Sequence, residues 1–520
     1  MRIRNNAAVA EQAGPLHRAV DLRTVTPDGA ATALLPESTA RELVAIPLAL
    51  NGDAVMVAVA EPSESVLSRL REVIGRPVTP LVAPRADILS TIGNSYRALV
   101  GIDAQVKAFE ARDLIRKDSA RTDVAAAKDD APVVHVVSMF ITQALRDRAS
   151  DIHVEPRLDR LRVRYRIDGV LHDVLDLPGS MGPAVVSRIK ILGGMNIVER
   201  RRPQDGQISM EVEGRAVDIR VSTTSVVGGE KVVMRLLDKS RPLFRFGQLG
   251  MPEHMTRRYS ALLHSPYGMV ICAGPTGSGK TTTLYGSLSE INTPERNIMT
   301  IEDPVEYTVP SINQIQINEQ AGVTFANGLK SILRQDPDVI LVGEVRDVET
   351  ARIAVQSALT GHFVLSSLHA TDAASALHRL LDMGIENFLV ASSVTAVLAQ
   401  RLVRRICDHC REYYQPPGEE LAFLASMGGH EPAGGFVRGA GCNFCAHTGF
   451  LDRIGVYEMM PISDGIRELI LRRASHGELH DYAVREGMRT LRDEAIRLVT
   501  SGVTTLSEVL RSIYLAGGTR

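Results

Sequence analysis

A glycine-rich stretch in the middle of the chain, GPTGSGKT, has the residue types and spacing needed to hold a phosphorylated ligand. It fits the pattern G-x-x-x-x-G-K-[ST], in which glycines let the backbone turn so that successive N–H groups point at phosphate oxygens. Lys280 would reach the β- and γ-phosphates, and the Thr281 hydroxyl would bind magnesium. The sequence therefore predicts a nucleoside triphosphate site. Its predicted residues are Gly274, Pro275, Thr276, Gly277, Ser278, Gly279, Lys280, Thr281 and Thr282.

The segments around this stretch predict a largely parallel sheet with helices on its faces. A short apolar run at 269–273 precedes the glycines, and residues 281–290 have the composition of a helix whose N-terminus would face the anion. Further apolar runs at 298–301, 339–342 and 363–368 alternate with helical segments. In such sheets ligands bind beyond the carboxyl ends of the strands. The residues that follow each strand are therefore expected to share one site.

Carboxylates and a histidine follow three of these predicted strands. Glu302, Asp303 and Glu306 come at or after the second strand, Glu344 follows the third, and His369 follows the fourth. Hydrolysis of a triphosphate needs a group that holds magnesium, a group that orients or deprotonates water, and a polar contact to the γ-phosphate. These five residues are the predicted catalytic set, together with Lys280.

One position departs from the usual metal-binding strand end, where an Asp precedes the Glu. That Asp is replaced by Gly343, so Glu302 or Asp303 is expected to share the magnesium and water-positioning work with Glu344. A surface acid is the competing interpretation of Glu344. A structural hydrogen bond is the competing interpretation of His369, and His362 precedes the same strand without an assigned role.

Four of the five cysteines occur as two C-x-x-C pairs after the predicted sheet. Cys407, Cys410, Cys442 and Cys445 would supply four thiolates, the ligand set that a structural zinc ion prefers. The segment between the pairs is longer than in common zinc ribbons, so a small helix is expected within it. Disulfides are the competing interpretation. The fifth cysteine, Cys272, is expected in the core.

Arginines gather in the segment before the glycine-rich stretch. In residues 161–167 apolar side chains alternate with Arg162, Arg164 and Arg166, which predicts a strand followed by a hairpin turn at 168–169. A second cluster, residues 200–202, precedes an expected turn at 205–206. Two interpretations stay open for these arginines. They pair with carboxylates of their own domain, or at least one of them contacts phosphate.

Composition excludes several classes of protein. The chain has 520 residues and a formal net charge of −2, a balance unlike that of chains built mainly to grip nucleic acid. No apolar run approaches the roughly 20 residues of a membrane span, and no apolar core of a secretory signal follows the N-terminus.

The predicted architecture is a multidomain α/β protein. The expected parts are an N-terminal docking domain (1–100), a linker (101–132), a middle α/β domain with the arginine strand (133–245), a RecA-like P-loop core with a parallel sheet (246–400), a tetracysteine metal-binding subdomain (401–455) and a C-terminal helical subdomain (456–520). In the last part, residues 505–508 fit a capping box.

The motifs together resemble one family, the secretion ATPases of type II secretion and type IV pilus assembly. The resemblance is carried by GPTGSGKTTTLY, TIEDPVEY, RQDPDVILVGEVRD and TGHFVLSSLHATDA, and upstream by ASDIHVEP, RVRYRIDGVL and RRRPQDGQIS. The cysteine pairs are similar to those of type II secretion and pilus-extension members. The first hundred residues more weakly resemble the domain by which the type II member docks on an inner-membrane partner.

The resemblance implies an ATP hydrolase that works as a hexameric ring on the cytoplasmic face of the inner membrane, bound there through that partner, and drives pseudopilus assembly. ATP, Mg²⁺ and a structural Zn²⁺ are the implied cofactors. Arg164, Arg166, Arg201 and Arg202 are the implied arginines that reach the nucleotide. Three alternatives remain: a pilus-extension motor, a nucleic-acid motor, and a scaffold that barely hydrolyses. The nucleic-acid motor is disfavoured because the chain has no Trp for base stacking.

Overall fold

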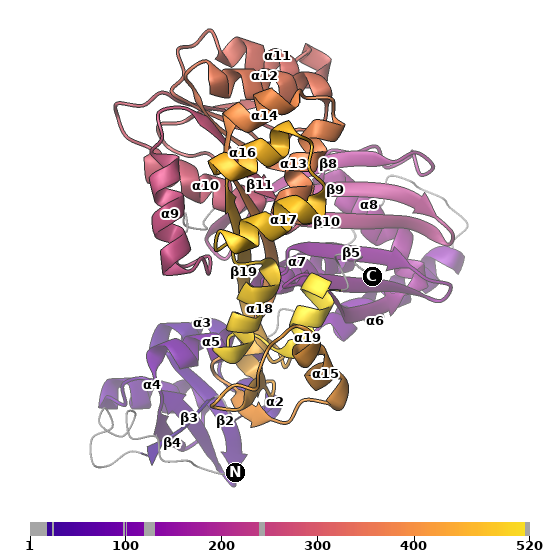
Figure 1. Cartoon of the computed structure of the whole chain (residues 1–520). Coiled ribbons are helices and arrows are strands. Elements are labelled where there is room, and N and C mark those ends of the chain that lie inside the picture. The colour runs from indigo at the N-terminus through magenta and orange to yellow at the C-terminus, as the bar shows by residue number, and fades with distance from the viewer. Residues whose placement is uncertain are drawn as a thin grey trace. The chain divides into compact units, whose positions relative to one another are not determined.

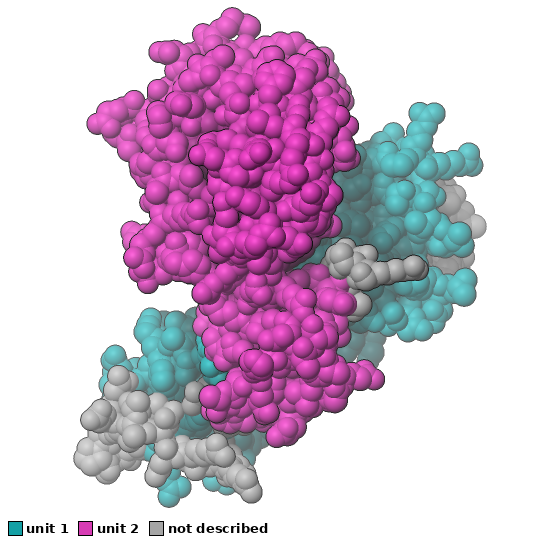
Figure 2. All heavy atoms as spheres, in the orientation of Figure 1, with its two compact units in different colours: residues 1–240, 407–411, 439–451 teal, residues 241–406, 412–438, 452–520 magenta. Residues whose placement is uncertain are grey.

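A computed structural model describes residues 18–22, 25, 27–96, 99, 101–118, 131–238 and 245–514. The chain forms two compact units, which Figure 2 colours separately. The first comprises residues 1–240, 407–411 and 439–451, and the second comprises residues 241–406, 412–438 and 452–520. Figure 1 shows their helices and strands, labelled where there is room.

The N-terminal part of the first unit has a four-stranded sheet in the order β1-β4-β3-β2. In this sheet β3 is an apolar strand, and the helix α4 that follows it ends at the C-cap Gly75, whose φ of 68° favours glycine. The elements are β1 (Arg18–Ala19), α2 (Gly29–Thr32), α3 (Glu37–Leu43), β2 (Ala45–Asn51), β3 (Ala54–Val59), α4 (Glu64–Ile74), β4 (Val78–Val82) and α5 (Arg85–Ser95).

A six-stranded antiparallel sheet follows in the same unit, in the order β7-β6-β5-β10-β9-β8. The predicted arginine strand and its hairpin are present as β6 and β7, joined at Asp168 and Gly169, which both have positive φ. The elements are α6 (Ile102–Asp118), α7 (Ala131–Arg146), β5 (Asp151–Pro156), β6 (Arg160–Ile167), β7 (Val170–Pro178), α8 (Gly182–Leu192), β8 (Gln204–Val212), β9 (Arg215–Val226) and β10 (Gly229–Asp238).

Two expectations for this region differ from the structure. The first part of the expected linker is helix α6, whose Ile102 and Phe109 are buried in the core under the six-stranded sheet, while residues 119–130 lie outside the described part. The turn expected at Asp205 and Gly206 is wrong, because both residues lie in β8. Glycine is needed at position 206 because the backbone at Gly193 approaches it closely: a Cβ there would lie 2.4 Å from the Gly193 carbonyl oxygen.

The second unit is built on a seven-stranded sheet in the order β13-β12-β14-β15-β11-β16-β19. The pairings that join β13, β12, β14, β15, β11 and β16 are all parallel, as the sequence predicts for the RecA-like core. The elements are α9 (Glu253–Leu263), β11 (Gly268–Ala273), α10 (Lys280–Ile291), β12 (Ile298–Glu302), β13 (Asn313–Gln316), α11 (Phe325–Ile332), β14 (Val339–Val342), α12 (Val348–Leu359), β15 (Phe363–Leu368), α13 (Ala373–Asp382), α14 (Asn387–Ser393) and β16 (Val394–Ile406).

The sheet is apolar on both faces, which explains its uninterrupted apolar runs. Along β11, Met269 and Ile271 belong to a core shared with α11, α12, α13 and α14, whereas Val270 and Cys272 belong to a core shared with α9 and α10. Side chains of a strand point alternately to the two faces, so a strand covered on both sides needs apolar residues at every position. The carboxyl ends of these strands carry the residues considered below.

In the sequence, the cysteine pairs lie between two strands of this sheet, β16 and β19 (Phe450–Pro461). These strands extend across the domain boundaries expected at 400 and 455. The insert holds β17 (Arg411–Tyr414), the expected helix as α15 (Gly418–Ser426), and β18 (Phe436–Gly439). The C-terminal helices are α16 (Asp464–Leu471), α17 (His476–Arg485), α18 (Leu491–Thr500) and α19 (Leu506–Val509). No helix in the described ranges is long and apolar enough to span a bilayer.

The capping box expected at 505–508 is only half formed. Thr505 accepts the Glu508 N–H, but the Glu508 carboxylate is buried and binds Arg404 and Arg511 instead of returning to the Thr505 backbone. Complete capping boxes begin α17 and α18, at Ser475 and Thr490.

Candidate functional site

The glycine-rich loop runs from the end of β11 into the start of α10, as the sequence predicts. Gly277 and Gly279 have φ values of 77° and 88°, a region that favours glycine. A Cβ at Gly274 would lie 2.4 Å from Ser278 Oγ and 2.7 Å from the Gln400 carbonyl oxygen. Ser278 Oγ is itself buried without a hydrogen-bond partner in this structure. A tight glycine cradle, an unpartnered hydroxyl and a helix N-terminus fit a bound phosphate chain.

Lys280, the first residue of α10, is held against this loop. Its Nζ donates hydrogen bonds to the carbonyl oxygens of Gly274 at 2.9 Å and Pro275 at 3.0 Å. Burial lowers the pKa of Lys280, and the neighbouring charge of Glu344 opposes that shift. The ammonium group therefore lies against the loop, whose Gly274 N–H donates to the Leu368 carbonyl oxygen at the end of the neighbouring strand β15 at 3.1 Å. Thr281 is exposed and Thr282 is half-buried on the first turn of the helix.

Residues from three strand ends meet beside the loop. Glu344, after β14, lies with its Oε2 3.5 Å from His369 Nε2, after β15. Arg346 forms an ion pair with Glu344, and its Nη1 lies 3.7 Å from Oδ2 of Asp303, after β12. The predicted convergence of Asp303, Glu344 and His369 is thus present. Arg346 was not singled out from the sequence, although its place two residues after Glu344 was a usable signal.

Glu302, by contrast, lies inside the protein. Its carboxylate accepts hydrogen bonds from the Tyr285 hydroxyl, from Thr300 Oγ1 at 2.6 Å and from Gln314 Nε2 at 3.2 Å. Only 3% of the residue is exposed. Burial, followed by the hydrogen bond to Glu302, raises the pKa of Tyr285, so the tyrosine remains a donor. The position of Glu302 fits support of the strand end better than direct contact with magnesium.

Two other candidates differ in location. Glu306 is half-buried in the segment after β12. His362 precedes β15, and its Nδ1 lies 3.0 Å from the Ser357 carbonyl oxygen. The six-residue strand β15 lies between His362 and His369, which are seven residue steps or about 23 Å apart at 3.3 Å per residue. His362 is therefore outside the site.

The missing Asp at position 343 has a steric explanation. The Gly343 N–H donates to the Ile301 carbonyl oxygen at 2.8 Å. A Cβ at this position would lie 3.2 Å from that oxygen and 3.3 Å from the Glu302 Cα. Glycine thus permits β12 and β14 to approach closely where the strands end. The acid at this strand end is consequently Glu344 alone.

Two adjacent residues of β16 bind the backbone of the loops that form the site. The sequence analysis did not identify either of them. Gln400 Nε2 donates to the Ser278 carbonyl oxygen at 2.7 Å, and Gln400 Oε1 accepts from Cys272 Sγ at 3.2 Å. Arg401 Nη2 donates to the Thr371 carbonyl oxygen at 2.6 Å, on the loop that follows His369. Both residues are buried. The lone cysteine is also in the core as expected, and burial raises its pKa to about 12.

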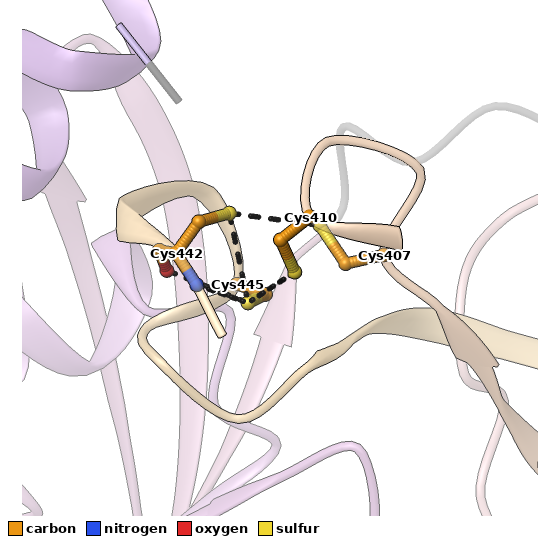
Figure 3. A group of neighbouring side chains, drawn as sticks. All are labelled: Cys407, Cys410, Cys442 and Cys445. Carbon is orange, nitrogen blue, oxygen red and sulfur yellow. Dashed lines mark hydrogen bonds between the residues drawn. The ribbon is translucent and has the colours of Figure 1, made fainter. Parts of the chain in front are cut away.

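The four paired cysteines form a compact cluster in the first unit (Figure 3). Their ligand atoms all lie within 4.8 Å of one another. The Cys407–Cys442 and Cys442–Cys445 sulfur distances are both 3.8 Å, and that of Cys410–Cys445 is 3.9 Å. Tetrahedral zinc with Zn–S bonds of about 2.3 Å requires sulfur separations of about 3.8 Å. Disulfides need about 2.05 Å, so the cluster fits zinc and excludes the disulfide interpretation.

The cluster also has the surroundings of a thiolate site. Backbone N–H groups of Cys442 and Gly449 donate to Cys445 Sγ, and that of Gly441 donates to Cys410 Sγ, at 3.2–3.3 Å. The His409 ring stacks on Phe444 with centroids 4.2 Å apart. This histidine is therefore packed on an aromatic side chain, and the four cysteines form a complete ligand set without it.

The arginines of β6 pair with carboxylates of their own sheet. Arg164 Nη2 lies 2.8 Å from Glu155 Oε1, and Arg166 Nε lies 3.7 Å from Asp151 Oδ2. Arg162 pairs with Asp173 at 3.0 Å. The interpretation of local pairing thus accounts for these three side chains.

Arg201 and Arg202 differ from the β6 arginines. Their side chains are exposed and have no ion pair within the described ranges, and their backbone N–H groups donate to Glu199 Oε1 at 2.7 and 3.2 Å. Of the four arginines that the family resemblance implies at the nucleotide, these two are therefore the ones whose side chains are not held by a described ion pair.

Comparison with known proteins covers most of the chain. The family described as "Type II/IV secretion system protein" matches residues 126–511, and the MshEN domain matches residues 15–101. The type II secretion system protein HxcR of Pseudomonas aeruginosa is 48% identical over 390 residues, which cover 75% of this chain and 79% of that protein. The type IV pilus assembly ATPase PilB of Myxococcus xanthus is 41% identical over 491 residues, 92% of this chain and 85% of that protein.

A solved structure agrees with the fold. The ATPase DotB of Legionella pneumophila matches 74% of this chain and 96% of its own with a TM-score of 0.54, at 20% identity. Because the sequence match to residues 126–511 spans the six-stranded sheet, the glycine-rich loop and the cysteine cluster, the chain belongs to the type II/IV secretion system protein family.

Proposed function

We propose that this protein hydrolyses ATP to power protein export by type II secretion. The observation that carries the proposal is the glycine cradle with Lys280 after β11, next to the end of β15, where Glu344 Oε2 lies 3.5 Å from His369 Nε2. Hydrolysis of a triphosphate depends on positioning and on charge stabilisation, and this arrangement supplies both.

Each residue of the strand ends has a separate role in the proposal. The loop and Lys280 bind the phosphates, and Thr281 with Asp303 holds the magnesium ion, which would neutralise phosphate charge. Glu344 orients or deprotonates the attacking water, since it follows β14 at the carboxyl edge of the sheet, is less buried than Glu302, and lies with its Oε2 3.5 Å from His369 Nε2. His369 contacts the γ-phosphate, and Glu302 and Glu306 support the strand end.

The cysteine cluster is proposed to hold one structural zinc ion. Four thiolates close the coordination sphere, so the ion would have no open position for chemistry. Its function would be to fix the two knuckles of the insert between β16 and β19.

The secretory function rests on the family and on the named relatives. Relatives called type II secretion system protein and type IV pilus assembly ATPase match the chain at 48% and 41% identity. Type II secretion is preferred because the higher identity belongs to that group, and pilus assembly is the alternative. We propose a hexameric ring on the cytoplasmic face of the inner membrane, docked there through the N-terminal domain on a secretion-platform protein.

Arginine contact with the nucleotide is a further part of the proposal. Arg164 and Arg166 would have to leave their carboxylate partners, whereas Arg201 and Arg202 have no ion pair to break among the described residues. Arg201 and Arg202 are therefore the preferred candidates, and their guanidinium groups suit developing phosphoryl charge.

The deciding experiment measures ATPase rate against protein concentration, with the cytoplasmic domain of the platform partner or with single-stranded DNA. The proposal expects stimulation by the partner and a rate per chain that rises as the ring assembles. Several-fold stimulation by DNA, with no effect of the partner, would identify a nucleic-acid motor instead.

A further inference from the structure

A cavity of about 400 Å³ lies within the six-stranded-sheet domain of the first unit, formed by residues between 156 and 230. Residues from four separate segments line it: the β5–β6 turn, the start of α8, the loop before β8, and the β9–β10 turn. No residue of the glycine-rich loop or of the cysteine cluster belongs to it. Its volume is in the range of small-ligand and side-chain pockets.

Arginines dominate the charge of the lining. They are Arg157, Arg160, Arg200 and Arg201, and the one acid of the lining is Glu230. That acid forms an ion pair with Lys190, which is 1% exposed, so its charge is already neutralised. The cavity therefore has excess positive charge that the lining itself does not balance.

The pairing of these arginines leaves donors available. Arg157 is itself exposed and lies 3.5 Å from the buried carboxylate of Glu155, whereas Arg160 lies 3.1 Å from Asp176 and 3.2 Å from Asp159 in exposed pairs. Exposed pairs such as those of Arg160 contribute about 0–1 kcal/mol and exchange partners easily. Arg200 and Arg201 have no ion-pair partner within the ranges that the structure describes.

The loop that carries Arg200 and Arg201 is fixed by its own hydrogen bonds. The Asn196 side chain accepts from the Val198 N–H at 2.9 Å, and Gln204 Nε2 donates to the carbonyl oxygens of Asn196 at 3.0 Å and Glu199 at 2.9 Å. Lys190 Nζ also donates to the Glu199 carbonyl oxygen at 2.6 Å. Arginines on a rigid backbone lose less entropy on binding, so the loop is preorganised for an anionic partner.

Apart from glycines and Ser225, the rest of the lining is apolar. Leu161 and Val186 are 1% and 4% exposed, and two prolines and Val226 also line the cavity. No lining residue is aromatic, so a nucleotide base would find no stacking partner. A simple phosphate ion would leave the apolar surface unfilled. A peptide with an apolar side chain between carboxylates satisfies both parts of the lining.

We propose that this cavity binds an acidic peptide segment of a partner protein, with carboxylates on Arg157, Arg160 and Arg200 and an apolar side chain against Leu161 and Val186. Val227, 97% exposed on the β9–β10 turn, would extend the contact surface. The proposal does not rest on the proposed ATPase function, because Arg157, Arg160 and Arg200 are not among the residues proposed to contact the nucleotide or the zinc ion.

The test measures fluorescence anisotropy of a fluorescein-labelled peptide, Glu-Asp-Leu-Glu-Asp, with the full-length chain at low salt. We expect saturable binding that weakens as salt is added, and no binding of Gln-Asn-Leu-Gln-Asn. The double variant Arg157→Gln/Arg160→Gln should bind at least about tenfold more weakly, since a hydrogen bond to a charged group contributes about 1.5–3 kcal/mol.

A matched control changes the same charge elsewhere. Arg69→Gln/Arg257→Gln removes two exposed arginines outside the cavity and should bind like the unmodified chain. Val226→Glu, at the rim, should weaken peptide binding through like-charge repulsion. If Arg157→Gln/Arg160→Gln unfolds at a lower temperature than the unmodified chain, the Val226→Glu result is the one that tests the proposal.

Three results would overturn the proposal. One is equal peptide binding by the two double variants. Another is displacement of the peptide by an equal concentration of inorganic phosphate, which would define a simple anion site. The third is loss of peptide binding as the chain self-associates, which would assign the cavity to a second copy.

Discussion

The side-chain amide of Gln400 donates a hydrogen bond to the Ser278 carbonyl oxygen at 2.7 Å, from β16 to the glycine-rich loop. The other end of the same amide accepts from Cys272 Sγ at 3.2 Å on β11. Gln400 is fully buried, so water does not compete for either bond. The backbone that would cradle phosphate is thereby fixed by a residue of a neighbouring strand.

Substitution of Gln400 by Leu should weaken ATP binding. The Ser278 carbonyl oxygen would lose its partner at a cost of about 1–3 kcal/mol, and the loop would relax from the geometry that fits phosphate. We expect KM for ATP to rise about tenfold, with a smaller change in kcat. Steady-state ATPase measurements check this.

Ser366→Ala provides the control for the Gln400 variant. Ser366 Oγ donates to the Val342 carbonyl oxygen at 2.9 Å, another buried bond between strands but away from the loop. This variant should lose thermal stability and keep its KM. An equal rise of KM in both variants would mean that general destabilisation, and not the loop contact, is the cause.

Lys280 and Glu344 are expected to separate binding from hydrolysis. Lys280→Ala removes the charge that meets the phosphates, so both ATP binding and turnover should be lost. Glu344→Gln keeps the shape of the side chain but removes the base, so ATP should still bind while turnover falls by about 100-fold or more. Calorimetric ATP titration beside the ATPase assay distinguishes the two.

Asp372, which pairs with His476, provides a control for the separation of ATP binding from hydrolysis. Asp372→Asn changes an acid on the loop after His369 whose Oδ1 faces His476 at 2.9 Å and not the glycine loop. It should retain far more turnover than Glu344→Gln. Equal loss of ATP binding in Lys280→Ala and Glu344→Gln would remove the proposed division of roles.

The parts that the sequence predicted correctly depend on local patterns. The glycine loop, the strands that precede each acid, and the two C-x-x-C pairs are all set within a few residues of chain, so spacing suffices to find them. The parallel order follows from alternation of strands and helices. Asp303, Glu344 and His369 meet because parallel strands end at one edge.

The parts that were missed depend on contacts distant in sequence or on choices that spacing does not settle. Gln400 and Ser278 are 122 positions apart, and nothing near either residue indicates the contact. Glu302 and Thr300 share one face of β12, so the carboxylate turns inward to Thr300 and Tyr285 where a site residue was expected. Gly206 resembles a turn residue in sequence, yet its requirement is a close backbone approach.

The cysteine cluster should contain about one zinc ion per chain in purified protein. Cys407→Ser removes one of four thiolate ligands and should abolish most of the bound zinc, because an incomplete closed site loses affinity steeply. Elemental analysis measures the zinc content.

Cys272→Ala is the matched control for the zinc measurement. This cysteine is buried in β11 and lies outside the cluster of four, so its loss should leave zinc content unchanged. Full zinc content in Cys407→Ser would contradict the site.

The ion pairs of Glu508 should make the stability of the folded protein depend on pH. Its fully buried carboxylate accepts from Arg404 at 2.8 and 3.0 Å, and it also binds Arg511. Burial by itself raises the pKa of Glu508, but the hydrogen bonds from Arg511 and Arg404 outweigh it and hold the pKa below the ordinary 4.5. A lowered folded-state pKa means that this stabilisation is present above about pH 4.5 and is lost as the pH falls through the folded-state value.

Glu508→Gln should therefore destabilise the protein by about 3 kcal/mol at pH 7, because it leaves Arg404 facing an uncharged group at a buried position. The difference in free energy of unfolding between the two proteins should begin to shrink below pH 4.5, because the carboxylate of the unfolded, unmodified chain is then protonated while the folded one still resists protonation. Urea unfolding at pH 7 and pH 4 measures both values. Glu253→Gln, which removes an exposed pair with Arg257, should change stability by less than about 1 kcal/mol at either pH. A Glu508→Gln difference that is the same at pH 7 and pH 4 would show that the effect comes from packing and not from the charge.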